Sequence, residues 1–288
     1  NNFLKVFYLR RICRIFPLYF SWLLLCVAIC KAPPSIKLHF FPPIFPSNTE
    51  FWTYFLYLQN LVGPMAHGIM PVCLAVTWSL AVEEQFYGVM PVLISMLPRK
   101  TLAVLMGLVV VSSPFIRLYF APPFWRWDGL SLGVLLALAQ RDAQIWNALK
   151  AGRGGIRFLW ILTMLTAWIA PVYVSIPRAF VISLHDISWT FLVLLTITGD
   201  GLVTWLTTRT LLVKAGAISY GLYLLHLPML YFIFWWENGV GLIDFFDWVL
   251  TALAFVLVWV VAQVSYEYFE RPIVAWGHRV KYLKAASP

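Results

Sequence analysis

The sequence predicts an all-α protein, a polytopic bundle of transmembrane helices. Of its 288 residues, 61% are hydrophobic and 11% are charged, whereas soluble domains are about 45–50% apolar and about 25% charged. One core cannot hide apolar residues in such excess, so lipid has to surround many of them. This composition excludes a cytosolic enzyme, a secreted disulfide scaffold, a disordered chain and a nucleic-acid-binding protein.

Apolar runs long enough to cross a bilayer recur along the chain, and eight are predicted to span it. They are Ile15–Ala32, Thr77–Leu97, Leu102–Phe120, Phe124–Ala139, Ile156–Val174, Ala179–Thr198, Ala215–Trp236 and Phe246–Tyr266. A ninth apolar piece, Phe51–Val62, is short for a span, and we expect it to be re-entrant or interfacial. The sequence shows no internal repeat, so residues 1–288 are predicted to form a single transmembrane domain.

The distribution of charge predicts the topology. The chain carries 21 Lys and Arg against 12 Asp and Glu, a formal net charge of +9. If Phe51–Val62 does not cross and the N-terminus is inside, sixteen of the basic residues lie on the cytoplasmic side; if it crosses, seven do. Basic residues concentrate in cytoplasmic loops, so we expect both termini in the cytoplasm. The four cysteines show no spacing typical of metal ligands, and no metal is expected.

Ionisable side chains at membrane depth are unfavourable and usually face a cavity, a partner or a substrate. The first such group lies at the start of the first predicted span, where Arg10, Arg11 and Arg14 can share one helical face. Guanidinium groups at this spacing suit phosphate or pyrophosphate. The alternative is an ordinary basic anchor that contacts lipid headgroups.

A second group lies in the next predicted span. Ser79, Glu83 and Tyr87 recur every fourth residue and form one polar stripe, whereas Glu84 points elsewhere. Two adjacent carboxylates are hard to explain by packing, which favours a functional site. A glutamate pair solvated at the headgroups is the alternative.

A third group, Arg126 and Asp128, opens a helix that continues through Gly129 and Gly133. We interpret these two residues as an interfacial salt bridge in which the aspartate also complements the helix dipole.

The fourth group, Ser219, Tyr223 and His226, lies on one face of a later span. Its members either line a cavity or hold a histidine that is hydrogen-bonded within the bundle.

The fifth group is Glu270, followed by Arg271 and Pro272, where the proline should stop or kink the helix. A carboxylate at a helix C-terminus opposes the dipole, so it needs a cationic partner or a role. The cluster from Arg10 to Arg14 is predicted to lie on the same side of the membrane.

Taken together, these motifs resemble those of the acyltransferase family 3 membrane proteins. The matching blocks occur in the family's order along nearly the whole chain. They are Arg11-x-x-Arg14-Ile15-x-Pro17-x-Tyr19, Trp78-Ser79-Leu80-x-x-Glu83-Glu84-x-Phe86-Tyr87 with Pro91, Arg126-x-Asp128 with Gly133, Ser219-Tyr220-x-x-Tyr223-Leu224-x-His226, and Glu270-x-Pro272.

The resemblance implies an enzyme of the bacterial inner membrane. It would move an acyl group, commonly acetyl, from cytoplasmic acyl-CoA to a hydroxyl of a carbohydrate or lipid-linked glycan. By the same resemblance, Arg11, Arg14 and Tyr19 would bind the acyl-CoA, and Glu270, His226 and Glu83 would be catalytic. Substrate binding would fall to the remaining motif residues, Trp78, Ser79, Glu84, Tyr87, Arg126, Asp128, Ser219 and Tyr223.

The chain departs from the family pattern at the N-terminal end of that pattern. Family members begin with two further helices, which carry a D-G-x-R-G segment and the histidine taken as the catalytic base. None of the five histidines of this chain matches that position, so we expect a truncated member with little activity of its own. A multi-span transporter and an inactive remnant are the alternatives, and binding of acyl-CoA would distinguish the enzyme from both.

Overall fold

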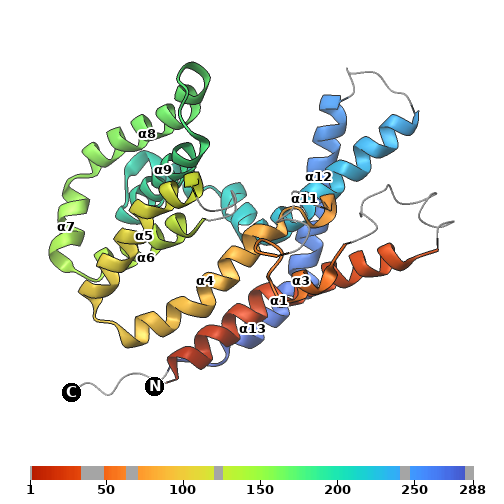
Figure 1. Ribbon diagram of the computed structural model, residues 1–288, viewed down its shortest axis with the longest axis horizontal. Coiled ribbons are helices and arrows are strands. Elements are labelled where there is room, and N and C mark those ends of the chain that lie inside the picture. Colours follow the sequence, from red (N-terminus) through yellow and green to blue (C-terminus); the bar gives the residue numbers. More distant parts are fainter. Residues whose placement is uncertain (1, 34–48, 63–70, 120–125, 241–246, 283–288) are drawn as a thin grey trace. The chain divides into compact units, whose positions relative to one another are not determined.

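The computed structural model describes residues 2–33, 49–62, 71–119, 126–240 and 247–282, and within these ranges every regular element is a helix (Figure 1). This confirms the predicted all-α class. Among the described residues, six helical stretches are long and apolar enough to cross a membrane, which fits an integral membrane protein. Four are single helices: α1 (Phe3–Lys31), α5 (Arg99–Tyr119), α8 (Arg153–Tyr173) and α9 (Arg178–Thr198).

The other two are Thr210–Ile233, within α11 (Thr210–Val240), and Trp248–His278. The latter runs through α12 (Asp247–Ser265), the π-helical turn η3 (Tyr266–Glu270) and α13 (Arg271–His278).

The predicted count of eight spans is not confirmed. Helix α4 (Thr77–Met96) has the length of a span, but two adjacent glutamates lower its hydropathy. Helix α6 (Trp127–Gln140) has 14 residues, and a span needs about 20. Within the piece predicted not to cross, α3 (Phe51–Phe55) has five residues, too few to span a bilayer. The predicted ends at Phe120, Phe124 and Phe246 lie outside the described residues.

The chain forms two compact units. Unit 1 comprises Asn1–Ala81 and Lys214–Pro288, and unit 2 comprises Val82–Val213. Unit 1 contains α1, α3, the short 3₁₀ helix η1 (Val72–Leu74), α12, η3 and α13. Helix α4 begins in unit 1 and continues into unit 2, and α11 begins in unit 2 and continues into unit 1 from Lys214. Unit 2 also contains α5 to α10, including α7 (Ala143–Ala151) and α10 (Gly201–Thr207). The prediction of a single domain stays a prediction.

In unit 1, helix α1 begins twelve residues before the predicted span, so its basic N-terminal stretch is also helical. This stretch packs against α13, and the two helices lie side by side (Figure 1). Arg10 donates to the carbonyl of Val280 at 3.1 Å, and its guanidinium lies 4.8 Å from the centre of the Tyr282 ring. Asn2 donates to the carbonyl of Lys281 at 3.0 Å. The two ends of the unit are therefore held together.

Gly277 lies at a point of close approach between these two helices. A Cβ atom added there would lie 2.8 Å from the Cys13 Sγ and 2.9 Å from the Cys13 Cβ. Replacing Gly277 with Ala is therefore expected to lower the free energy of unfolding by about 1–3 kcal/mol, because α13 has to move away from α1. Gly216→Ala is the matched control, since nothing lies within 4 Å of that added Cβ. Thermal unfolding in detergent compares them, and equal midpoints would contradict the close packing.

Unit 2 is held by a buried ion pair between Arg117 on α5 and Asp128 on α6. Two parallel hydrogen bonds of 3.0 and 2.9 Å join the side chains, which are 2% and 1% exposed. Ser183 on α9 donates to the same carboxylate at 2.7 Å, and Arg117 donates to the carbonyl of Ala179 at 3.0 Å. Three helices are thus joined through two charged side chains.

The C-terminal end of α9 is capped by glycine and arginine. Gly199 has a φ of +77°, the left-handed conformation that commonly ends a helix. Arg153 donates to its carbonyl at 2.8 Å, which places a positive charge at the negative end of the helix dipole. Asp200 then caps α10, and the hydrogen bond that Arg157 donates to Asp200 holds the pKa of this carboxyl below its usual value.

Candidate active site

The candidate site is centred on Glu270, the last residue of the π-helical turn η3. At this turn the N–H of Arg271 donates to the carbonyl of Tyr266, five residues back rather than four. Pro272 lies two residues after Glu270. In a regular α-helix the ring of a proline clashes with the carbonyl oxygen four residues earlier, and the wider π-helical turn relieves this clash. Of the two outcomes predicted for Pro272, a stop or a kink, the stop is therefore wrong. The chain continues into α13, with Glu270 on the widened turn.

The Glu270 side chain is buried, with 2% of the residue exposed. Its Oε1 accepts a hydrogen bond from the Ser265 hydroxyl at 3.2 Å. Its Oε2 is also buried and accepts no hydrogen bond from the described residues. Arg14 on α1 is close enough for its charge to act on this carboxylate. One carboxylate oxygen thus keeps its lone pairs, within the electrostatic reach of a guanidinium group.

Helix α11 forms the wall of this site and approaches closely because Gly221 has no side chain. A Cβ atom at Gly221 would lie 3.2 Å from the Ala262 Cβ and 3.6 Å from the Glu270 Oε1. Helix α11 is tied to α1 by the Tyr220 hydroxyl, which donates to the carbonyl of Ile15 at 2.9 Å. The Arg14 Nη2 lies 3.5 Å from the carbonyl oxygen of Ala217 on the same helix.

The other predicted acyl-CoA ligands have different surroundings. Arg11 lies with its guanidinium 5.7 Å from the centre of the Phe7 ring and is half-buried. Tyr19 is 1% exposed, and its hydroxyl donates to the carbonyl of Tyr54 at 2.8 Å. Tyr19 therefore packs in the core of unit 1, where its ring stacks on Tyr57. Of the predicted ligands, Arg14 is the one whose charge reaches Glu270.

A second polar cluster joins the start of α4 to α11. The Tyr223 hydroxyl lies 2.6 Å from the Ser79 Oγ and donates to the carbonyl of Val76 at 3.0 Å. The His226 Nδ1 lies 2.7 Å from the carbonyl oxygen of Tyr223. A carbonyl only accepts, so this nitrogen carries the proton and, in the neutral ring, the Nε2 keeps a lone pair. Trp78 packs beside this cluster on the core of unit 1.

The structure separates these two clusters. Gly221, which faces Glu270, and Tyr223 are two residues apart on α11, so they point about 200° apart around the helix. Glu270 and the Tyr223–His226 cluster therefore lie on different faces. The third member of the predicted stripe, Ser219, is exposed and donates to the carbonyl of Gly216 within its own helix.

The remaining predicted residues belong to unit 2. Glu83 and Glu84 are half-buried on α4, and Tyr87 packs on the apolar cluster around Phe86. The predicted salt bridge between Arg126 and Asp128 is wrong, because each residue has another partner.

Arg126 donates to Asp186 at 2.9 Å, and Asp128 pairs with Arg117. Residues two apart face opposite sides of a helix, so these partners come from neighbouring helices. Arg117 and Asp186 were missed in the sequence, although each is an ionisable residue inside a predicted span.

Comparison with known proteins gives one distant relative. A protein of Acidianus two-tailed virus, described as "Putative acetyltransferase ORF330", is 23% identical over 175 residues. The alignment covers 56% of this chain and 47% of the viral protein, so the chain spans about half the length of this relative. No protein-family profile matches the chain. No solved structure matches it either.

The likeness fits an acyltransferase. The six apolar helical stretches fit the same class in a membrane-embedded form.

Proposed function

We propose that the chain is a membrane-embedded acyltransferase that uses acyl-CoA, with acetyl as the acyl group. The acceptor is a hydroxyl of a carbohydrate or lipid-linked glycan, and the membrane is the bacterial inner membrane. The observation that carries the proposal is the buried Glu270, which has an oxygen without a hydrogen-bond donor among the described residues and lies within the electrostatic reach of Arg14. The distant likeness to the viral protein supports the same reaction class.

In this reaction the acceptor oxygen bonds to the carbonyl carbon of the thioester, and the bond from that carbon to sulfur breaks. Glu270 takes the proton from the acceptor hydroxyl as the new bond forms and then passes it to the departing CoA thiolate. A positioned base of this kind contributes about 10²–10⁴ to the rate. Arg14, with Arg11 three residues earlier on α1, holds phosphates of the CoA.

Binding of the donor tests the role of Arg14. Arg14→Lys is expected to weaken acetyl-CoA binding by about tenfold or more, because an ammonium group cannot reproduce the two parallel hydrogen bonds of a guanidinium. Titration calorimetry on the solubilised chain measures the affinity. Acetyl-pantetheine, which has no phosphate, should bind the variant and the parent chain equally.

Arg279→Lys is the matched control, because Arg279 is an exposed arginine of the same unit. Equal acetyl-CoA affinities of parent and Arg14→Lys would leave Arg14 as a basic anchor and remove the donor site from the proposal.

The proposed topology has both termini in the cytoplasm. Asn2 bonds to Lys281, so one reporter near the C-terminus locates both ends of unit 1. A cysteine at Lys281 is expected to react with an impermeant maleimide only in opened cells. A cysteine at Lys31, at the other end of α1, should react in intact cells. Both reporters require a background without the half-buried Cys30. The reverse pattern would invert the topology.

A further inference from the structure

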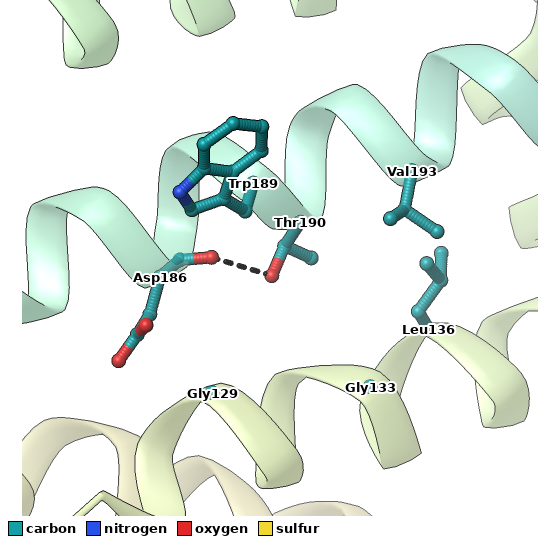
Figure 2. Close-up of a pocket in the computed structure, with 7 residues that line it drawn as sticks. All are labelled: Gly129, Gly133, Leu136, Asp186, Trp189, Thr190 and Val193. Carbon is teal, nitrogen blue, oxygen red and sulfur yellow. Dashed lines mark hydrogen bonds between the residues drawn. The ribbon is translucent and has the colours of Figure 1, made fainter. Parts of the chain in front are cut away.

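A groove in unit 2 lies between α6 and α9 and has a volume of about 270 Å³ (Figure 2). Its floor is the face of α6 that carries Gly129 and Gly133, four residues apart. A Cβ atom added at Gly133 would meet nothing within 4 Å, so the missing side chain leaves this space open. At the apolar end, Leu136 and Val193 point toward one another across the groove (Figure 2).

The other end of the groove is polar and is formed by Asp186. Its Oδ1 accepts a hydrogen bond from Arg126 at 2.9 Å, and its side chain is 13% exposed. Its Oδ2 is buried and accepts no hydrogen bond in the described part of the chain. A Cβ atom at Gly129 would lie 3.2 Å from the Asp186 Cγ, so the glycine lets this carboxylate lie against α6. A buried acceptor without a donor is unfavourable. Because Asp186 lines the groove, an occupant that donates a hydrogen bond would satisfy this oxygen once the side chain turns it toward the groove.

The surrounding charges indicate what kind of donor fits. Asp186 lies within the electrostatic reach of Arg126, Asp128 and Arg117. With Asp186 these form two positive and two negative groups, so the region is neutral. A cation or anion entering the groove would remain without a counter-charge at low dielectric. A neutral hydroxyl group is the donor that this arrangement accommodates.

The size and lining of the groove indicate what carries that hydroxyl. Ligand cavities typically measure about 300–1,000 Å³, so this one accommodates a single hydrocarbon chain rather than a nucleotide. Apart from Asp186 and Thr190, its lining is apolar. The Thr190 hydroxyl donates to the backbone carbonyl of Asp186 at 2.7 Å, and its proton is therefore not available to an occupant (Figure 2).

We propose that this groove binds a neutral single-chain lipid with a terminal hydroxyl. The hydroxyl donates to the Asp186 Oδ2, and the chain passes over Gly133 toward Leu136 and Val193. The site does not depend on the proposed acyl transfer, because all of its residues belong to unit 2.

Photolabelling of the full chain in phosphatidylcholine nanodiscs tests the site, because this lipid carries no hydroxyl group. The probes are dodecanol with a diazirine near the end of its chain and the methyl ether of the same compound, which cannot donate. Peptides of α6 and α9 are expected to be labelled about tenfold more by the alcohol than by the ether. Equal labelling by both probes would overturn the proposal, since water would then satisfy the carboxylate.

Three variants locate the label. Gly133→Leu is expected to abolish it by filling the groove, whereas Gly107→Leu, at another open glycine in unit 2, should leave it unchanged. Val193→Trp fills the groove from the opposite helix. It provides a second test of the site if Gly133→Leu fails to fold. Asp186→Asn should remove the preference for the alcohol, because an amide N–H satisfies the ether oxygen. Labelling that survives both Gly133→Leu and Val193→Trp would place the lipid elsewhere and overturn the proposal.

Discussion

In a chain extended by the two further helices with which members of the resembling family begin, replacing Glu270 with Gln is expected to reduce acyl transfer by about 10²–10⁴ while leaving acyl-CoA binding largely intact. Glutamine has the shape of glutamate, and its carbonyl oxygen can still accept the hydrogen bond from Ser265. It cannot take a proton from an acceptor hydroxyl. The loss should therefore appear in the turnover rate and not in the affinity for the donor. Release of free CoA thiol from acetyl-CoA, with and without an added glycan fraction, measures turnover.

Glu267→Gln is the matched control for this substitution. Glu267 lies three residues earlier in the same π-helical turn, but its side chain is 38% exposed and bonds to Arg271. Its replacement should leave turnover unchanged. Turnover by Glu270→Gln at the rate of the parent chain would exclude Glu270 as the base, and His226, whose Nε2 keeps a lone pair, would become the candidate.

Removing one partner of the buried ion pair in unit 2 is expected to cost about 3–5 kcal/mol of folding free energy. Asp128→Ala leaves the guanidinium of Arg117 buried without its counter-charge, and α5, α6 and α9 lose the carboxylate that joins them. Replacing both residues, as in Arg117→Met with Asp128→Leu, should recover most of this loss. Unfolding in detergent, followed by tryptophan fluorescence, compares the single and double variants.

The exposed pair between Arg271 and Glu267 provides the contrast. Its side chains are 65% and 38% exposed, so water screens the pair and it contributes little to the stability of the helix. Glu267→Ala should therefore be nearly neutral. Similar losses from Asp128→Ala and Glu267→Ala would show that the buried pair is not a structural support of unit 2.

The helical class could be predicted because it depends on local properties, namely composition and the length of apolar runs. Helix boundaries could not be predicted in the same way. Helix α1 extends through the basic residues before Ile15, because a helix needs backbone hydrogen bonds and a packing partner, whereas a span needs an apolar surface. Here the packing partner is α13, more than 250 residues further along the chain.

The candidate site could be predicted in part. The arginine cluster predicts a cationic partner for Glu270, and the charge of Arg14 acts on this carboxylate. The periodicity of Ser219, Tyr223 and His226 identified one face of α11, but not which neighbouring residues that face meets. Glu270 lies against the opposite face, where Gly221 permits close approach. Only tertiary packing distinguishes these two faces.

The π-helical turn at Tyr266–Glu270 amounts to one residue inserted into an otherwise continuous helix. Deleting one residue from it would leave a regular helix, yet everything beyond would rotate by about 100° and retreat by about 1.5 Å. Glu270 would then turn away from Arg14, and Gly277 would no longer face Cys13. The same extra residue therefore sets the orientation of the Glu270 carboxylate and the packing of α13 on α1. A shift in helical register at this turn would change both together.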